Sequence, residues 1–84
     1  MLYQNYPNPF NPNTIFKFDV AKKGLVRIVI YDVLGKEVEE LVNSELNPGT
    51  YQTDWNGANF ASGIYFYSLT SGDFSQTKKM VLIK

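Results

Sequence analysis

Acidic side chains are the first candidates for chemistry, and Glu37, Glu39 and Glu40 stand close together in the sequence. General acid–base catalysis requires a pair of carboxylates held in a desolvated cleft. These three occupy a stretch that we expect to be an exposed strand, and no further group is placed to build a cleft around them. We interpret them as a solvated face and not as a catalytic pair.

Metal and nucleophile sites are equally poorly supported. The spacing of Ser75 and Lys78 is odd, which sets them on opposite faces of a strand. Asp54, Asn56 and Asn59 share one loop but include a single carboxylate, whereas calcium sites cluster several oxygen ligands. The chain has no Cys and no His, which removes thiolate and imidazole groups. We expect no enzyme activity, no metal and no cofactor.

Aromatic rings offer a different kind of chemistry, the stacking of sugars. The chain contains six Tyr, six Phe and one Trp. A sugar-binding platform could be built from Tyr3, Tyr6, Tyr65, Phe66 and Tyr67. Core and edge packing is the alternative for the same rings, and in so small a chain most of them must be structural.

The charge balance points to no particular partner. Eight Lys and Arg offset eight Asp and Glu in 84 residues, which gives no reason to expect nucleic acid or an anionic membrane. The basic pairs Lys22-Lys23 and Lys78-Lys79 are expected to be solvated turn and edge residues that discourage edge-to-edge pairing. The length allows one domain with one modest core.

The elements that must position these side chains are short strands. Apolar residues alternate with polar ones in segments separated by Gly, Pro, Asn and Asp. These segments cover residues 14–20, 25–31, 36–43, 50–55, 63–70 and 74–83, and residues 2–4 can add a seventh edge strand. No segment keeps a helical period. We predict an all-β, immunoglobulin-like antiparallel β-sandwich of six to seven short strands, with local hairpins at 25–43 and 63–83.

Turns and strand interiors give more specific predictions. Residues 32–35 indicate a type I turn closed by a left-handed Gly35, and residues 46–49 indicate a type II turn with Gly49 in its second central position. At least two of Gly35, Gly49 and Gly63 should have a positive φ. The segment 36–43 should contain a bulge or a short helical turn. Trp55 should be buried, and residues 80–83 should be central in a sheet.

Residues 1–13 read as a lead-in rich in Pro and Asn, ahead of a sandwich at 14–84. Proline at 7, 9 and 12 fixes φ and removes backbone donors, so neither helix nor interior strand is expected there. We predict a stiff, ordered segment whose Tyr6 and Phe10 plug the end of the core. A junction spacer or a docking peptide is the functional alternative.

Five sequence runs resemble one known family. They are Tyr6-Pro-Asn-Pro-Phe-Asn-Pro, Ile30-Tyr-Asp-Val-Leu-Gly35, Leu46-Asn-Pro-Gly-Thr-Tyr51 with Trp55-Asn-Gly57, Ala61-Ser-Gly-Ile-Tyr-Phe-Tyr67 and Thr77-Lys-Lys-Met-Val-Leu-Ile-Lys84. Over residues 4–84 the chain resembles the type A C-terminal sorting domain of the type IX secretion system, with the immunoglobulin-like domain of the flagellar hook-capping protein as a wider relative. Its structural motif residues are Pro7, Pro9, Phe10, Gly35, Gly49, Trp55, Gly57 and Gly63.

The resemblance implies a function. Such a domain is a secretion and sorting signal that directs an N-terminal cargo, via the periplasm, through the type IX outer-membrane translocon. In many members a sortase-like signal peptidase then removes it and the cargo is anchored at the cell surface. The partners implied are these components and the cargo, with no nucleic acid and no membrane insertion. The chain is expected to be cut from the C-terminus of a larger exported protein, with the scissile bond upstream.

The final strand is the candidate recognition element. Exposed strands offer backbone donors and acceptors for strand addition. The candidate residues are Lys78, Lys79, Met80, Val81, Leu82, Ile83 and Lys84. An ordinary core strand is the alternative for this segment, and a carbohydrate-binding or spacer module of an extracellular enzyme is the alternative for the whole domain.

Overall fold

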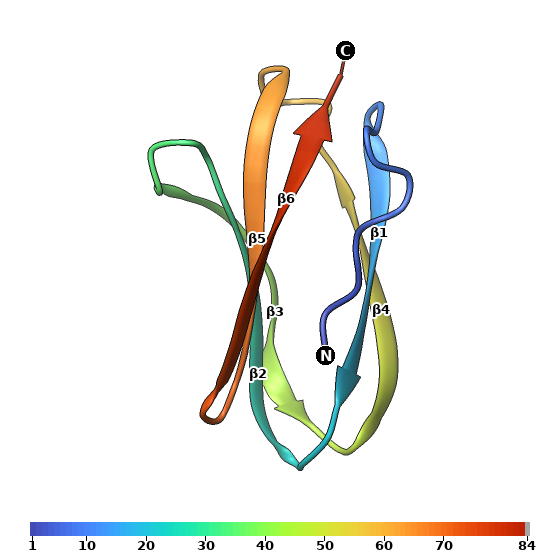
Figure 1. Ribbon diagram of the computed structural model, residues 1–84, viewed down its shortest axis with the longest axis vertical. Helices are drawn as coiled ribbons and strands as arrows, with labels where there is room; N and C mark the ends of the chain where they lie inside the picture. The colour runs from blue at the N-terminus through green and yellow to red at the C-terminus, as the bar shows by residue number, and fades with distance from the viewer. Residues whose placement is uncertain (84) are drawn as a thin grey trace.

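The protein is built from six antiparallel strands in two sheets. The computed structural model describes residues 1–83 and contains β1 (Asn13–Val20), β2 (Gly24–Tyr31), β3 (Glu37–Leu46), β4 (Gly49–Asn56), β5 (Gly63–Ser71) and β6 (Phe74–Leu82). One sheet has the order β1-β4 and the other the order β3-β2-β5-β6, and the two face each other (Figure 1). The prediction of an all-β sandwich is confirmed.

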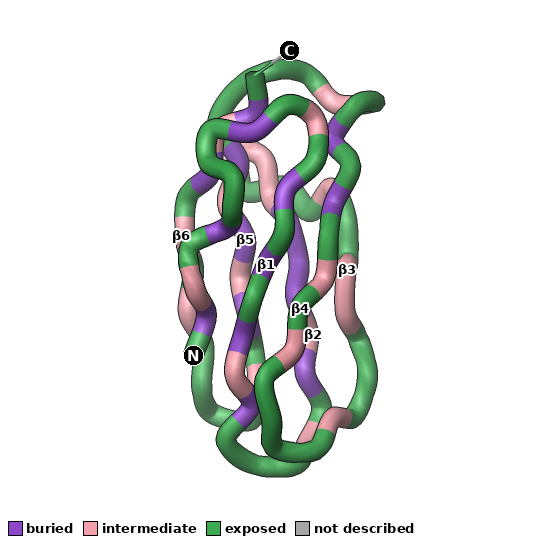
Figure 2. The backbone as a smooth tube through the Cα atoms, turned by 90° about the vertical axis from the view of Figure 1, so that its right-hand side faces the viewer, coloured by how far each residue is buried: buried purple, intermediate pink, exposed green. Residues whose placement is uncertain are grey.

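The core lies between the sheets and follows the two-residue period of the strands. Along β1, Phe16, Phe18 and Val20 are buried while Ile15 and Lys17 are exposed (Figure 2). The facing sheet contributes alternate residues in the same way, because successive side chains of a strand point to opposite faces. They are Val26, Ile28, Ile30, Tyr65, Tyr67, Leu69, Met80 and Leu82.

Both predicted hairpins are present, and both belong to the four-stranded sheet. β2 pairs with β3, and the register shifts between Ile28 and Val29 and again between Ile30 and Tyr31. These shifts are the irregularity expected in the segment 36–43. β5 pairs with β6 from Gly63↔Leu82 to Ser71↔Phe74. The pairing therefore brings the final strand beside β5 along its whole length.

The connection from β3 to β4 differs from the prediction. Gly49 has a φ of 158°, whereas the second central residue of a type II turn has a φ of about 80°. The type II turn at 46–49 was the wrong prediction, because β3 and β4 belong to different sheets and the chain crosses between them here instead of reversing within one sheet.

The lead-in joins the two sheets along one side of the sandwich. Its first part pairs with β1, since the Tyr3 amide donates to the Lys17 carbonyl and the amide and carbonyl of Tyr6 bond to Ile15. Phe10 then forms a parallel bridge with Leu82 at the end of β6. Phe10 is buried as predicted, but Tyr6 is 78% exposed and does not plug the core. Its backbone pairs with β1 while its ring points to solvent.

The immunoglobulin-like part of the fold prediction stays a prediction. Immunoglobulin domains have at least seven strands in two sheets, whereas the described residues form six, arranged as β3-β2-β5-β6 opposite β1-β4. Among the residues described, no helix has the length and apolar character needed to cross a bilayer.

Candidate functional site

The outer edge of β6 is the part of the molecule that bears on strand addition. β6 is the last strand of its sheet, so one of its edges faces β5 and the other does not. In an antiparallel ladder the backbone groups of alternate residues point to opposite edges. The backbone groups of Lys79, Val81 and Ile83 bond to the lead-in and therefore point away from β5. Ser75 and Thr77 share this alternation, so their backbone groups point the same way.

The lead-in already occupies the final part of this edge. The Phe10 amide donates to the Val81 carbonyl at 3.0 Å, and the Ile83 amide donates to the Phe10 carbonyl at 2.9 Å. The Val81 amide donates to Asn8 Oδ1 at 3.0 Å. Gln4 Nε2 donates to the Lys79 carbonyl at 2.9 Å. The end of β6 thus lies between β5 and the lead-in, which is the central position that the apolar run 80–83 predicted.

The open part of the edge lies nearer the β5–β6 hairpin. Within residues 1–83, the outward backbone groups of Ser75 and Thr77 and the amide of Lys79 have no hydrogen-bond partner. Ser75, Thr77 and Lys79 are also exposed. The lead-in also contacts β6 here, through the Leu2 amide that donates to Gln76 Oε1 at 3.0 Å, but it leaves these backbone groups unpaired. An extended chain could pair with them without breaking a backbone hydrogen bond, whereas further along it would have to displace the lead-in.

The predicted recognition residues divide into two groups by burial. Met80 and Leu82 are buried in the core, and Lys79 and Ile83 are exposed. Lys78 and Val81 are half-buried. Lys84 lies outside the described residues. Only part of the predicted set is therefore accessible to a partner without unfolding.

The motif residues have structural surroundings. Phe10 and Trp55 pack against each other with their ring centroids 5.9 Å apart. Gly57 lies against the same cluster, where an added Cβ would come within 3.1 Å of Leu82 Cδ2, so a side chain there would press on the end of β6. Gly35 has the left-handed φ of 82° that was predicted, and the prediction of at least two positive values is confirmed by Gly35 and Gly63. Pro7 and Pro9 are exposed in the lead-in.

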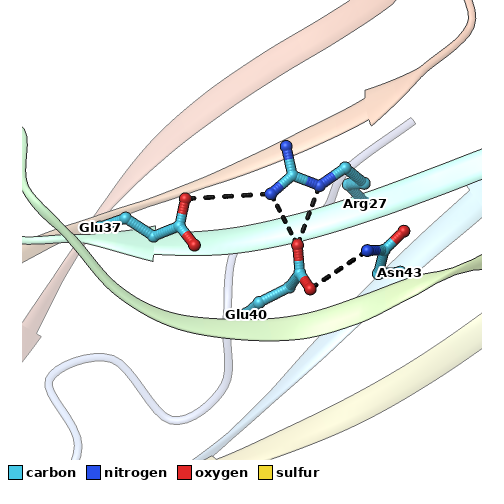
Figure 3. Close-up of polar contacts among 4 residues, drawn as sticks. All are labelled: Arg27, Glu37, Glu40 and Asn43. Atoms are coloured by element: carbon cyan, nitrogen blue, oxygen red, sulfur yellow. Dashed lines mark hydrogen bonds and ion pairs between the residues drawn. The ribbon is translucent and has the colours of Figure 1, made fainter.

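The acidic group on β3 forms an ion-pair cluster on the outer face of the four-stranded sheet (Figure 3). Arg27 Nε and Nη2 donate to Glu40 Oε2 at 2.9 and 2.6 Å, and Glu40 Oε1 accepts from Asn43. Glu37 lies 3.9 Å from Arg27 Nη2. The hydrogen bond from Arg27 lowers the pKa of Glu40. A carboxyl group that acts as a general acid needs a raised pKa, so the lowered pKa of Glu40 fits a surface ion pair instead.

The other candidates from sequence do not converge on a site. Asn56 Oδ1 accepts from the Ala58 amide at 2.9 Å and closes a turn, as its sequence context indicated. Residues 1–83 contain no group of three or more His, Cys, Asp or Glu that could hold a metal. The burial of Tyr65 and Tyr67 agrees with the core packing that was favoured for most of the rings, whereas Tyr6 is exposed.

Sequence reasoning missed the polar side chains that fix the lead-in. Asn5 is buried, and its Nδ2 donates to Thr14 Oγ1 at 2.9 Å and to the Pro7 carbonyl at 3.1 Å. The Tyr67 hydroxyl accepts from the Asn5 amide at 2.8 Å. No local pattern marks these contacts. The density of Asn among the prolines was the only available signal.

The structure thus defines a small β-sandwich module with a partly open strand edge on β6. The chain belongs to the secretion system C-terminal sorting domain family, whose model matches residues 4–84. It is a type IX sorting domain, and the protein of which it is part is exported to a secreted or cell-surface location. No curated protein and no solved structure matches the chain.

Proposed function

We propose that this domain is the ligand by which the type IX outer-membrane translocon selects its cargo, and that β6 is the strand it binds. The domain acts by being bound and catalyses no reaction. The observation that carries the proposal is the open edge of β6, where Ser75 and Thr77 present unpaired backbone groups among the described residues. A partner strand can satisfy such groups without regard to the identity of the cargo.

The lead-in connects the proposed site of cleavage with the end of β6. After export, a sortase-like peptidase cuts between the cargo and the sandwich of residues 14–84, and the cargo is anchored at the surface. Residues 1–13 lie between the two and hold the end of β6 through Asn8 and Phe10. The lead-in stays with the sandwich after such a cut and pairs only with the end of β6, so cleavage upstream leaves the open groups of Ser75 and Thr77 as they are.

Export of a fused reporter tests the proposal. Residues 1–84 are joined behind a periplasmic reporter in a host that has the type IX system, and the reporter is measured at the surface, in the medium and in the periplasm. The fusion should leave the cell, and deletion of residues 80–84 should retain it in the periplasm. Retention of the unmodified fusion would contradict the sorting function.

A backbone substitution separates strand addition from loss of core. Ser75→Pro removes one outward amide on the edge of β6, where no hydrogen bond within the sheet is lost. Export should fall for Ser75→Pro and stay unchanged for Ser75→Ala, with both melting curves compared with the original. Full export of Ser75→Pro would exclude pairing at this edge while leaving the sorting function intact.

Surface charge provides a further test. Lys79 is exposed, whereas Lys78 is half-buried beside the core, so only Lys79 is suitable for a charge reversal without structural cost. Lys79→Glu should reduce export while the free energy of unfolding changes by less than about 0.5 kcal/mol. Lys17→Glu, on the exposed face of β1 in the other sheet, is the matched control and should export normally.

A further inference from the structure

The turn between β2 and β3 is rigid. Asp32 Oδ1 accepts from the amides of Leu34 and Lys36, both at 2.9 Å. The Asp32 amide donates to the Lys36 carbonyl, and the Gly35 amide donates to the Asp32 carbonyl. The left-handed φ of Gly35 completes the reversal. Four hydrogen bonds therefore fix the backbone of five residues, and the loop projects outward from the four-stranded sheet, away from β1 and β4 (Figure 1).

This turn holds two apolar side chains in water. Val33 is 62% exposed and Leu34 is 89% exposed. None of the turn's hydrogen bonds uses these side chains, so the fold does not require them to be apolar. Turns of this kind normally carry polar residues at such positions. We call Val33 and Leu34 the apolar tip.

A groove lies next to the apolar tip, under the projecting loop. It has a volume of about 350 Å³ and is lined by the turn on one side and by β5 and β6 on the other. Tyr31 and Phe66, which are cross-strand partners, contribute its half-buried rings. Thr77 brings the open stretch of the β6 edge to the same groove. The apolar tip is thus continuous with the strand assigned to recognition.

The charges around the apolar tip define the partner's chemistry. Asp32 belongs to the turn, and Glu37, Glu39 and Glu40 lie in the first four residues of β3 that follow it. Lys36 and Arg27 offset two of these four negative charges. Arg27 is itself held by Glu40 and Glu37 (Figure 3). A second copy meeting tip to tip would set these acids against each other, whereas a surface carrying Lys or Arg would be attracted.

We propose that the apolar tip inserts into an apolar pocket with a basic rim on a protein component of the type IX export machinery. This inference rests on the sorting function and adds a second contact to that of β6. The rigid turn makes the insertion favourable, because little conformational freedom remains to be lost on binding. Covering Val33 and Leu34 would remove exposed apolar area from water, which favours binding roughly in proportion to the area covered.

Paired substitutions in the exported fusion test the proposal. Val33→Ser with Leu34→Ser should lower the ratio of exported to periplasmic reporter by at least about tenfold, the loss expected for a binding anchor. Leu25→Ser is the matched control, since Leu25 is 56% exposed on β2 at the other end of the strand from this turn. It should export within about twofold of the original, and all three purified domains should melt alike. Export of the tip variant at the original level would overturn the proposal.

Charge reversal tests the basic rim. Glu37→Lys should reduce export, and Glu45→Lys, at the other end of β3 and also within 4.0 Å of a cation, should not. Equal export of both variants would show that the partner's pocket has no basic rim, and would overturn that part of the proposal. A concentration-dependent dimer that the tip substitution converts to a monomer would assign the tip to a second copy and overturn the proposal. If the unmodified fusion stays in the periplasm, the sorting function fails and this inference fails with it.

Discussion

Tyr67 shows how one buried hydroxyl ties the lead-in to the core. Its ring lies 4.7 Å from that of Phe16, and its hydroxyl accepts from the Asn5 amide and donates to the Tyr3 carbonyl. Burial raises the pKa of Tyr67 to about 12, although the hydrogen bond from Asn5 acts in the opposite direction. The folded protein therefore favours the neutral phenol more strongly than the unfolded chain does.

This shift predicts instability in alkali. Because the folded pKa lies above the ordinary value of 10, the stabilisation is complete below pH 10 and is lost as the pH rises toward about 12. Unfolding in urea at a series of pH values should show this loss. Tyr67→Phe should abolish most of it and cost about 1–3 kcal/mol at neutral pH, since the Asn5 amide loses its acceptor. Tyr51→Phe, which removes an exposed hydroxyl, should leave the alkaline loss in place.

Trp55 is the residue on which the aromatic cluster is centred. It is 4% exposed and lies within 6 Å of Phe10, Phe60 and Tyr65, measured between ring centroids. Its emission should be blue-shifted, and Trp55→Ala should lower the free energy of unfolding by about 3–5 kcal/mol. Its Nε1 is buried without a partner among the described residues, so Trp55→Phe should cost clearly less than Trp55→Ala. Equal losses would contradict the assigned packing of the Trp55 ring in this cluster.

Among the elements, the lead-in contributes to stability through a few residues only. Phe10 is buried and bonds to Val81 and Ile83, while Tyr6 is exposed. Phe10→Ala should cost about 3–5 kcal/mol and should speed hydrogen exchange of the Ile83 amide. Tyr6→Ala should change stability by less than about 0.5 kcal/mol. Slow exchange at Ile83 in the Phe10 variant would contradict the assigned pairing.

The sequence allowed the strands to be predicted because their signal is local. Alternation places Phe16 and Phe18 inward and Lys17 outward whatever the partner strand is, and Asp32 and Gly35 specify their turn within four residues. The route of the lead-in has no such signal. The bond between Asn8 and Val81 joins residues 73 positions apart, and no alternation relates them.

The candidate site was predictable to a smaller extent for the same reason. The family resemblance, joined to the physics of strand addition, pointed to the final strand, and residues 78–82 lie on an edge strand. Which part of that edge is free depends on where Gln4, Asn8 and Phe10 lie, and this is a property of the folded chain. The exposure of Tyr6 and the crossing at Gly49 were missed because both depend on contacts between sheets.

At the scale of the whole molecule, the two sheets share a single core. The buried residues of β1 and β4 belong to the same cluster as those of β2, β5 and β6, so neither sheet has a core of its own. Unfolding should be one cooperative transition. The midpoints from far-ultraviolet circular dichroism, which reports all six strands, and from Trp55 fluorescence, which reports β4, should coincide. Separate midpoints would indicate that the sheets unfold independently.

The lead-in also decides how the molecule resists a pulling force. It runs parallel to β6 at Phe10, and the N-terminus lies in the lower half of Figure 1 while the described chain ends at the top. A force applied at residue 1 would act first on the pairing of the lead-in with β1, at Tyr3 and Tyr6, and then on the hydrogen bonds of Phe10 with the end of β6. We therefore expect the lead-in to detach before either sheet of the sandwich is disturbed.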